Sequence, residues 1–279
     1  MSKWIDLALD RETGIETLHA HFAGHKHAYD PHWHDTYLIG FTEQGVQRFN
    51  SRQIRHDSTP GKVFMLEPGD IHDGDAPSPD GFTYRMLYLQ PAWLEQALDD
   101  LQLRGREAGL PSVGTVLNDD PGLARATLFA FNALHKQDVR MVREVALDML
   151  LERLAAHLYR RPQPTIVSRA PMIARQARDY LMAYYEQDIS LHTLAEACGT
   201  DRFRLTRAFK AAYGLAPHAW LIQLRLSRGR QMLAAGMQPV QVASRLGFSD
   251  QSHLGRWFVR AYGMTPGAYQ QRTVGADRR

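Results

Sequence analysis

The 279-residue chain is longer than one hydrophobic core usually serves, so we expect two domains. Acidic residues near the N-terminus exclude a signal peptide, and the absence of any run of about 18 apolar residues excludes a membrane span. The single cysteine, Cys198, excludes an internal disulfide and a cysteine-cluster zinc site. We therefore expect a soluble, cytoplasmic protein with no membrane partner. The net charge of +3 divides into −6 for residues 1–163 (17 Lys and Arg, 23 Asp and Glu) and +9 for residues 164–279 (16 and 7), so the second part favours nucleic acid or another polyanion as its partner.

The first 90 residues predict β-structure. Short runs rich in β-branched and aromatic residues are separated by turn formers such as Pro68-Gly69-Asp70. The predicted strands are Ile15–Phe22, Tyr37–Thr42, Val46–Phe49, Val63–Leu66 and Phe82–Leu89. Several short strands at this spacing are typical of a sandwich or a small barrel, which we place at residues 1–91.

From Pro91 the apolar residues recur at spacings of three and four, which predicts helices. The predicted helices, Trp93–Leu103, Pro121–His135 and Val139–Tyr159, form a region that we place at residues 92–161. The last helix has an apolar stripe that suits packing either on the β-structure or on a second copy of the chain. Its members are Val142, Val145, Ala146, Met149, Leu150, Leu154 and Leu158. Residues 162–171 show neither period and are rich in proline, so we expect a linker there.

Residues 172–272 contain one unit twice, at a separation of 49 residues. Each copy consists of a short helical segment, a glycine and a longer helix. The paired positions include Leu205 and Leu254, Arg207 and Arg256, Phe209 and Phe258, and Tyr213 and Tyr262, and the turn glycines are Gly199 and Gly247. A helix, a glycine turn and a second helix, present twice, predict two helix-turn-helix motifs.

The longer helix of each copy has an inner apolar face and an outer polar face at about 100° per residue. Arg207 and Arg256 lie in the middle of the outer faces, and arginine suits bidentate contact with guanine or phosphate. Residues 217–235 between the copies predict one helix of roughly 28 Å at about 1.5 Å per residue, close to the roughly 34 Å between successive major grooves on one side of DNA. The alternative, a plain helical bundle with solvated arginines, needs neither two glycine turns nor a repeated outward arginine.

Residues 172–272 resemble the DNA-binding domain of the AraC/XylS family of bacterial transcription regulators. The resemblance is carried by Leu191-His-Thr-Leu-Ala-Glu-Ala-Cys-Gly199, Val242-Ala-Ser-Arg-Leu-Gly-Phe-Ser-Asp250 and Gly263-Met-Thr-Pro266. It implies that bases are read by Phe203, Thr206 and Arg207 in the first copy and by Gln251, Ser252, Gly255 and Arg256 in the second. Arg204, Lys210 and Arg260, which lie beside them, complete the set of candidate DNA contacts.

Three positions depart from the family pattern. Gly229 stands where alanine is usual, Val259 where lysine is usual and Gln270 where arginine is usual. The glycine is expected to cost up to about 1 kcal/mol of helix stability. The loss of two cations leads us to expect weaker phosphate contacts in the second copy.

Residues 15–90 resemble the cupin-type ligand-binding domain that many members of this family carry, on His32-Trp33-His34, Gly45, Gly61 and Pro68-Gly-Asp-Ile-His72. The resemblance implies an α+β protein of two domains. The N-terminal one is a cupin-like β-barrel followed by dimerisation helices, and the C-terminal one is all-α, with two helix-turn-helix motifs joined by a linker helix. The implied partners are double-stranded DNA, a small-molecule effector, RNA polymerase and a second copy in a homodimer.

Eight of the thirteen histidines lie within residues 19–72, and imidazole is the commonest metal ligand. His32, His34 and His72 are therefore a candidate metal site. A metal-binding cupin, however, has a carboxylate four or five residues after the second histidine, where this chain has Leu38 and Ile39. We accordingly expect a metal-free pocket and no cofactor. Candidate pocket residues, each with ordinary strand packing as the alternative, are His32, Trp33, His34, Tyr37, His72, Tyr84 and Arg85.

The sequence thus predicts a sequence-specific DNA-binding regulator that is not an enzyme, and an activator if it follows the family's commoner outcome. One alternative is a cupin-type metalloenzyme with an accessory DNA-binding domain, which predicts turnover and a bound metal. Another, a methyl-transfer DNA-repair protein, needs a reactive cysteine. Cys198 lies on a helix just before a turn, where we expect it to fill core.

Overall fold

The computed structural model describes residues 3–24, 27–101, 111–160 and 171–274. The chain divides into two compact units, residues 1–163 and residues 164–279. We call them the N-terminal unit and the C-terminal unit. The predicted linker at 162–171 lies, except for Pro171, outside the described residues. None of the described helices combines the length and the apolar character that a membrane span requires.

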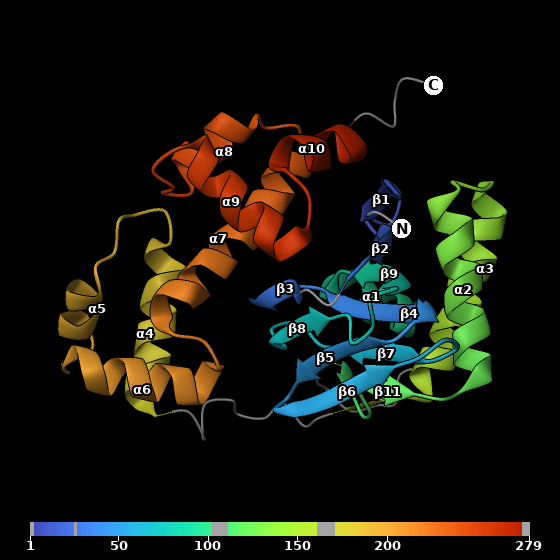
Figure 1. Cartoon of the computed structure of the whole chain (residues 1–279), viewed down its shortest axis with the longest axis horizontal. Helices are drawn as coiled ribbons and strands as arrows, with labels where there is room; N and C mark the ends of the chain where they lie inside the picture. Colours follow the sequence, from blue (N-terminus) through green and yellow to red (C-terminus); the bar gives the residue numbers. More distant parts are fainter. Residues whose placement is uncertain (1–2, 25–26, 102–110, 161–170, 275–279) are drawn as a thin grey trace. The chain divides into compact units, whose positions relative to one another are not determined.

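The N-terminal unit contains two main antiparallel sheets (Figure 1). The six-stranded sheet has the order β1-β2-β9-β4-β7-β11, with β1 (Trp4–Leu9), β2 (Glu16–Phe22), β4 (Tyr37–Gly45), β7 (Val63–Leu66), β9 (Phe82–Leu89) and β11 (Leu117–Asn118). The four-stranded sheet has the order β3-β8-β5-β6, with β3 (His27–His32), β5 (Gln47–Ser51), β6 (Ile54–Ser58) and β8 (His72–Asp75).

These two sheets correct the closed barrel expected from the cupin resemblance. Among the described strands, no pairing joins one of these sheets to the other. The chain passes from β4 in one sheet to β5 in the other at Gly45, whose φ is +71°. A Cβ on Gly45 would lie 2.1 Å from the Gly81 carbonyl oxygen, so only glycine fits where the two segments meet.

The two faces of the six-stranded sheet pack on different partners, because side chains alternate along each strand. One face packs on α1 (Pro91–Asp100), α2 (Pro121–His135) and α3 (Arg140–Ala155). The buried core between them includes Ile15, Ile39, Val63, Met65, Leu87, Leu89, Leu94, Phe131, Ala146, Leu150 and Leu154. The other face meets the four-stranded sheet through ring contacts such as Phe64 with Phe49 and Tyr84 with Tyr29.

The third predicted helix is shorter than expected. It ends at Ala155 rather than Tyr159, where the backbone tightens as Ala156 and His157 donate to carbonyls three residues back. Residues 158–160 then form β12 (Leu158–Arg160), which pairs with β10 (Pro111–Val113) in a separate two-stranded sheet. The β-forming pair Leu158 and Tyr159 belongs to this ladder, which a helical period alone does not reveal.

The C-terminal unit is helical throughout its described residues. Its helices are α4 (Met172–Tyr184), α5 (Leu191–Ala197), α6 (Arg202–Tyr213), α7 (Pro217–Ala234), α8 (Pro239–Arg245), α9 (Gln251–Tyr262) and α10 (Pro266–Val274). Side-chain caps begin three of these helices: the side chains of Ser190, Asp201 and Asp250 accept hydrogen bonds from backbone N–H groups of the first turns of α5, α6 and α9. Both long motif helices end at a left-handed glycine, Gly214 and Gly263.

Candidate nucleic-acid interface and the interior of the N-terminal unit

The first helix-turn-helix motif consists of α5, the turn at Gly199 and α6. Leu205 and Phe209 anchor α6 in the core and are fully buried. The predicted contact residues Phe203, Arg204, Arg207 and Lys210 are exposed, and Thr206 is half-buried. Phe203 is 78% exposed, an unusual position for a ring that has no polar group. An exposed ring beside three cations suits a surface that meets DNA, where apolar groups contact the thymine methyl.

The second motif consists of α8, the turn at Gly247 and α9. Leu254, Phe258 and Ala261 are buried. The predicted contact residues Gln251, Ser252, Arg256 and Arg260 are exposed, and Gly255 is half-buried with no atom within 4 Å of the position of a Cβ. His253, Gly255, Arg256, Trp257, Val259, Arg260 and Thr265 line an open hollow of roughly 730 Å³ along this helix.

The helical period places Trp257 on the inner apolar face of α9 with Leu254 and Phe258, and the structure corrects this detail. Trp257 is half-buried rather than part of the inner core. Its indole nitrogen donates to His253 Nε2 at 3.0 Å, and the guanidinium of Arg260 lies 5.3 Å from the centre of its ring. The hydrogen bond and the cation–π contact both restrict the side chains of the outer surface of α9.

Helix α7 joins the two motifs and is buried along most of its length. Arg225 of this helix is only 6% exposed. Its guanidinium donates to the carbonyls of Tyr185 at 2.7 Å and Gln187 at 2.7 Å, which precede α5, and to the carbonyl of Gly247 at 2.8 Å, in the turn of the second motif. One side chain of α7 therefore joins the segment between α4 and α5 to the turn of the second motif. Burial lowers the pKa of Arg225, and Asp188 opposes this shift.

The three departures from the family pattern have distinct surroundings. A Cβ on Gly229 would lie 3.2 Å from Leu246 and 3.5 Å from Val242, so the glycine lets α8 pack closely on α7. Gln270 donates to the carbonyl of Met237 at 2.7 Å and so has a partner within the protein. Val259 is 40% exposed, beside Arg260.

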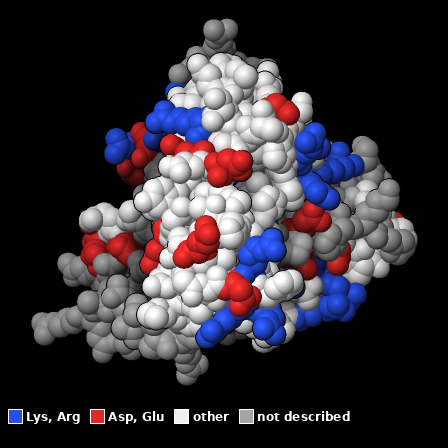
Figure 2. All heavy atoms as spheres, turned by 90° about the vertical axis from the view of Figure 1, so that its left-hand side faces the viewer, with Lys and Arg blue, Asp and Glu red and all other residues white. Residues whose placement is uncertain are grey.

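Basic and acidic side chains alternate in groups on the face of the molecule drawn in Figure 2. Lys and Arg form separate groups there, with Asp and Glu between them. The charge on this face is therefore arranged in patches.

His32, His34 and His72 come together in the interior of the N-terminal unit. His32 ends β3 and is the register partner of His72 at the start of β8, and His34 follows two residues after His32. All three are buried, and ligand nitrogens of the three rings lie within 4.8 Å of one another. Burial lowers the pKa of His72, while its hydrogen bond to the Asp70 carbonyl and the carboxylates of Asp70 and Asp73 oppose the shift.

The other predicted pocket residues have different surroundings. Tyr84 is buried and forms a short hydrogen bond with Tyr29, whose ring packs on His32, and Trp33 is also buried. Burial raises the pKa of both phenols well above the usual value. Tyr37 and Arg85, in contrast, lie on the helix-covered face of the sheet. This corrects their placement in one pocket with the histidines, because successive residues of a strand point to opposite faces.

The partners of Tyr37 and Arg85 confirm that they face the helical side. The Tyr37 hydroxyl donates to the carbonyl of Pro111 at 2.5 Å. Arg85 donates to Glu43 at 3.0 Å and to Asn132 of α2 at 3.0 Å. Both side chains therefore have a structural role between the sheet and the segments that cover it.

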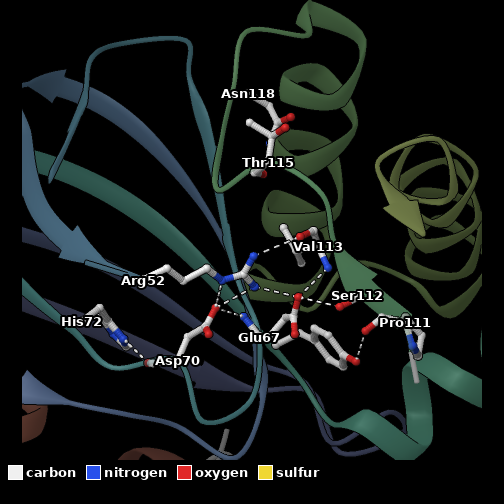
Figure 3. A network of polar contacts seen from close by, with 10 residues as sticks. Arg52, Glu67, Asp70, His72, Pro111, Ser112, Val113, Thr115 and Asn118 are labelled. Carbon is white, nitrogen blue, oxygen red and sulfur yellow. Dashed lines mark hydrogen bonds and ion pairs between the residues drawn. The ribbon is translucent and has the colours of Figure 1, made fainter. Parts of the chain in front are cut away.

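A polar network that the sequence did not predict holds the loop before His72 (Figure 3). Nη2 of Arg52 lies 2.6 Å from Oε1 of Glu67 and 2.9 Å from Oδ2 of Asp70. Nη1 of Arg52 donates to the carbonyl of Val113 at 3.1 Å. Glu67 in turn accepts from the Val113 amide at 2.7 Å and from the Ser112 hydroxyl at 2.9 Å. The network thus ties the loop that presents His72 to β10.

Arg52 lies in a hairpin turn with Gln53 that the sequence does not signal. Both residues have positive φ, 51° and 66°. This is the conformation of a type I′ hairpin turn, which usually contains Asn and Gly. A positive φ is unfavourable for a residue with a side chain such as arginine. Arg52 adopts it at the position where its guanidinium forms ion pairs with Glu67 and Asp70.

Cys198 has the surroundings of a core residue. It is 8% exposed, and burial raises the pKa of its thiol. A reactive cysteine instead needs a lowered pKa and access. The environment therefore agrees with the expectation that Cys198 fills core.

Comparison with known proteins assigns the chain to a family. The family model of the AraC-like ligand binding domain matches residues 12–151, half of the chain, and that of a helix-turn-helix domain matches residues 194–272. The chain belongs to the AraC family of transcription regulators. As the sequence predicts, it is a DNA-binding regulator with a ligand-binding domain.

Relatives of the regulator match over most of its length. The uncharacterized HTH-type transcriptional regulator YbfI of Bacillus subtilis is 27% identical over 252 residues, which cover 89% of this chain and 88% of that protein. The MmsAB operon regulatory protein of Pseudomonas aeruginosa is 24% identical over 251 residues, which cover 86% and 76%. These relatives are transcription regulators rather than enzymes, so the metalloenzyme alternative has no support.

The fold of the regulator is that of a solved member of the family. The crystal structure of ToxT from Vibrio cholerae matches with a TM-score of 0.58 at 9% identity, over 95% of this chain and 100% of that one. This match confirms the predicted combination of an N-terminal β-rich domain with a C-terminal helical domain.

Proposed function

We propose that the regulator reads DNA with the outer faces of α6 and α9 and that each subunit contacts two successive major grooves. The observation that carries the proposal is the repeated placement of an exposed arginine, Arg207 and Arg256, on the two motif helices of one unit. The caps at Asp201 and Asp250 and the glycine stops fix both helices independently of DNA. Preformed reading helices lose little conformational entropy on binding.

Replacing Arg207 or Arg256 by Ala is expected to weaken binding to a specific site by about 1 to 3 kcal/mol, roughly 5- to 150-fold, if each reads a base. The site is first found by genome-wide mapping of bound DNA. Affinity is then measured by fluorescence anisotropy on that site and on unrelated DNA at one salt concentration. A base-reading arginine lowers the specific affinity far more than the nonspecific affinity.

Arg272→Ala is the matched control, because Arg272 is exposed on α10, which is not one of the two motif helices. It removes the same charge and is expected to change both affinities slightly and equally. If Arg207→Ala and Arg256→Ala behave like Arg272→Ala, the assignment of base reading is wrong.

We further propose a homodimer that pairs through α3. The predicted apolar stripe divides in the structure: Ala146, Leu150 and Leu154 are buried in the unit, whereas Val145 and Met149 are 48% and 46% exposed. Met141, one turn before Val145, is 75% exposed. These three residues recur every four positions, which places them along one face of the helix. A second copy of the chain would cover this face.

Val145→Lys combined with Met149→Lys is expected to convert the dimer into a monomer, because two charges would be buried at its interface. Sedimentation velocity of the full chain measures the change. Ile54→Lys is the control, since Ile54 is a 60% exposed apolar residue of β6 in the same unit. A dimer that persists in the double variant, or a wild-type chain that is monomeric at micromolar concentration, contradicts this interface.

The effector is proposed to bind in the N-terminal unit and to change how the motifs are presented to DNA. One ToxT structure contains an unsaturated fatty acid, and another contains (E)-4-(8-methylnaphthalen-1-yl)but-3-enoic acid. Both compounds join an apolar body to a carboxylate. By analogy with these ToxT ligands, we propose that the effector of this regulator is a small organic molecule. We propose that its binding leads to contact with RNA polymerase and to activation of transcription.

A further inference from the structure

The buried histidines of the N-terminal unit form a convergent set of nitrogen donors. His32 and His34 lie at the end of β3 and just after it, His72 comes from β8, and ligand nitrogens of the three rings lie within 4.8 Å of one another. The centre of the His32 ring lies 4.4 Å from that of His72 and 4.9 Å from that of His34. Small rotations of the rings would bring three nitrogens to about 2.0–2.1 Å from one ion, the usual Zn–N distance.

The hydrogen bonds of two of these histidines fix which nitrogen faces the centre. His32 Nδ1 lies 2.7 Å from the carbonyl of Asp30, and His72 Nδ1 lies 3.0 Å from the carbonyl of Asp70. A carbonyl oxygen can only accept, so Nδ1 carries the proton in both rings and Nε2 of the neutral imidazole keeps its lone pair. Metal-binding histidines are oriented by the same kind of hydrogen bond.

The surroundings also hold the cluster in place. The Asp70 carbonyl accepts from His72 Nδ1, and the Asp70 side chain is itself held by Arg52 (Figure 3). Tyr29 and Tyr88 pack on the other two histidines, with ring centres 5.8 Å from His32 and 5.4 Å from His34. These rings limit the access of water to the cluster, and the loop network holds His72 in place.

The missing carboxylate does not exclude a metal. A cupin site with four protein ligands needs it, and the sequence therefore indicates a metal-free pocket. Three histidines alone nevertheless bind zinc in sites that keep the fourth position for water or another small ligand. The absence of a carboxylate after His34 led us to expect a metal-free pocket. Because the structure brings all three histidine rings together in a buried site, we now expect metal binding.

We propose that His32, His34 and His72 bind one divalent transition-metal ion, of the Zn²⁺ or Co²⁺ type, with a coordination position left for a small molecule. This site goes beyond the proposed DNA reading and effector response, and metal binding can be tested without any DNA. The ion would join β3, the segment after it and β8, and would make the loop network around Arg52 part of its support.

The experiment uses the full chain without a polyhistidine tag, stripped with a chelator and then titrated with Zn²⁺ and Co²⁺. Elemental analysis after desalting is expected to find one ion per chain, and Co²⁺ is expected to give visible absorption bands much stronger than those of the hydrated ion. Thermal unfolding is expected to shift upward with added Zn²⁺, because an ion that binds only the folded state stabilises it.

His34→Gln and His72→Gln are expected to lower the affinity for Co²⁺ by at least about 100-fold, more than the loss of an outer-shell partner does. His56→Gln is the matched control, because His56 is a half-buried histidine of the four-stranded sheet outside the cluster, and it is expected to bind like the wild type. Circular dichroism checks that each variant folds.

Two results would overturn the site: a wild-type chain that takes up no ion beyond weak surface binding, or His34→Gln and His72→Gln variants that bind as tightly as His56→Gln. If the two variants do not fold, the wild-type Co²⁺ spectrum decides. Weak bands like those of hydrated cobalt reject the site, and strong bands of a four- or five-coordinate ion support it. Failure of DNA binding in Arg207→Ala leaves these readings unchanged, so the two proposals fail separately.

Discussion

Replacing Arg225 by Met is expected to lower the free energy of unfolding of the C-terminal unit by about 3 kcal/mol or more. The guanidinium donates to three carbonyls, those of Tyr185, Gln187 and Gly247, and is almost completely buried. Hydrogen bonds from a charged donor contribute roughly 1.5–3 kcal/mol each, and buried acceptors without a partner are costly. The segment between α4 and α5 and the turn of the second motif are expected to loosen together, because the three carbonyls belong to these two segments.

The measurement is hydrogen exchange of the full chain, resolved by segment, together with urea unfolding. Loss of protection is expected in the segment between α4 and α5 and in the turn at Gly247. Arg228→Met is the control, since Arg228 lies three residues further along α7 and is half-exposed. Arg225→Lys should recover little stability, because one ammonium group does not reproduce the planar fork of guanidinium donors. An Arg225→Met variant as stable as Arg228→Met would refute this role.

Replacing Gly247 by Ala is expected to destabilise the C-terminal unit by about 2 to 5 kcal/mol. Its φ of +70° is one that alanine disfavours by roughly 1–2 kcal/mol. In addition, the new Cβ would lie 2.6 Å from the carbonyl oxygen of Glu186 and 2.8 Å from Nη2 of Arg225. The backbone or the Arg225 side chain must then move, which adds the cost of an overpacked site.

Gly199 provides a matched control within the same chain. It occupies the corresponding turn of the first motif with φ +62°, but no atom lies within 4 Å of the position of its Cβ. Gly199→Ala should therefore cost only the conformational part, about 1–2 kcal/mol. Thermal and urea unfolding of both variants measure the difference. Equal losses at the two glycines would show that the contact with Arg225 has no energetic weight.

A double variant tests whether the two predictions describe one interaction. Groups in direct contact give non-additive losses. Gly247→Ala is expected to cost less in the Arg225→Met background than in the wild type, because the side chain that its Cβ would meet at 2.8 Å has changed. Additive losses would indicate that the strain lies only against the carbonyl of Glu186.

The C-terminal unit was predictable because its signals are local. The caps at Ser190, Asp201 and Asp250, the stops at Gly214 and Gly263 and the helical period all act within a few residues of one another. The repeat of one sequence unit at a separation of 49 residues then predicted that these helices form two helix-turn-helix motifs. The contacts of Arg225 were not predictable, because its three acceptors are backbone groups 22 to 40 residues away and backbone carbonyls leave no mark in the sequence.

The N-terminal unit was predicted less completely. The five predicted strands are present as β2, β4, β5, β7 and β9, but β1, β3, β6 and β8 were not predicted. β3 contains Pro31, and β8 reads His-Asp-Gly-Asp, so neither has the composition of a strand. Their pairing is imposed by the neighbouring strands, and local preference does not show it.

The same limit applies to the predicted pocket. Sequence proximity placed Tyr37 beside the histidines and Arg85 beside Tyr84, yet a shift of one residue along a strand reverses the face. Only the register of β4 with β9 and the contacts of α2 decide which side is the interior. His32, His34 and His72 were identified as a group from their spacing, but their convergence depends on the pairing of β3 with β8.

The packing of both motifs on α7 has a consequence for the DNA itself. Inserting one base pair between the two segments read by a subunit moves the second by about 3.4 Å and turns it by roughly 34° around the duplex axis. A protein with a flexible joint would follow that displacement, whereas two motifs that pack on one buried helix cannot. Operators of this regulator should consequently vary in base identity more readily than in the helical phase of the two segments that one subunit reads.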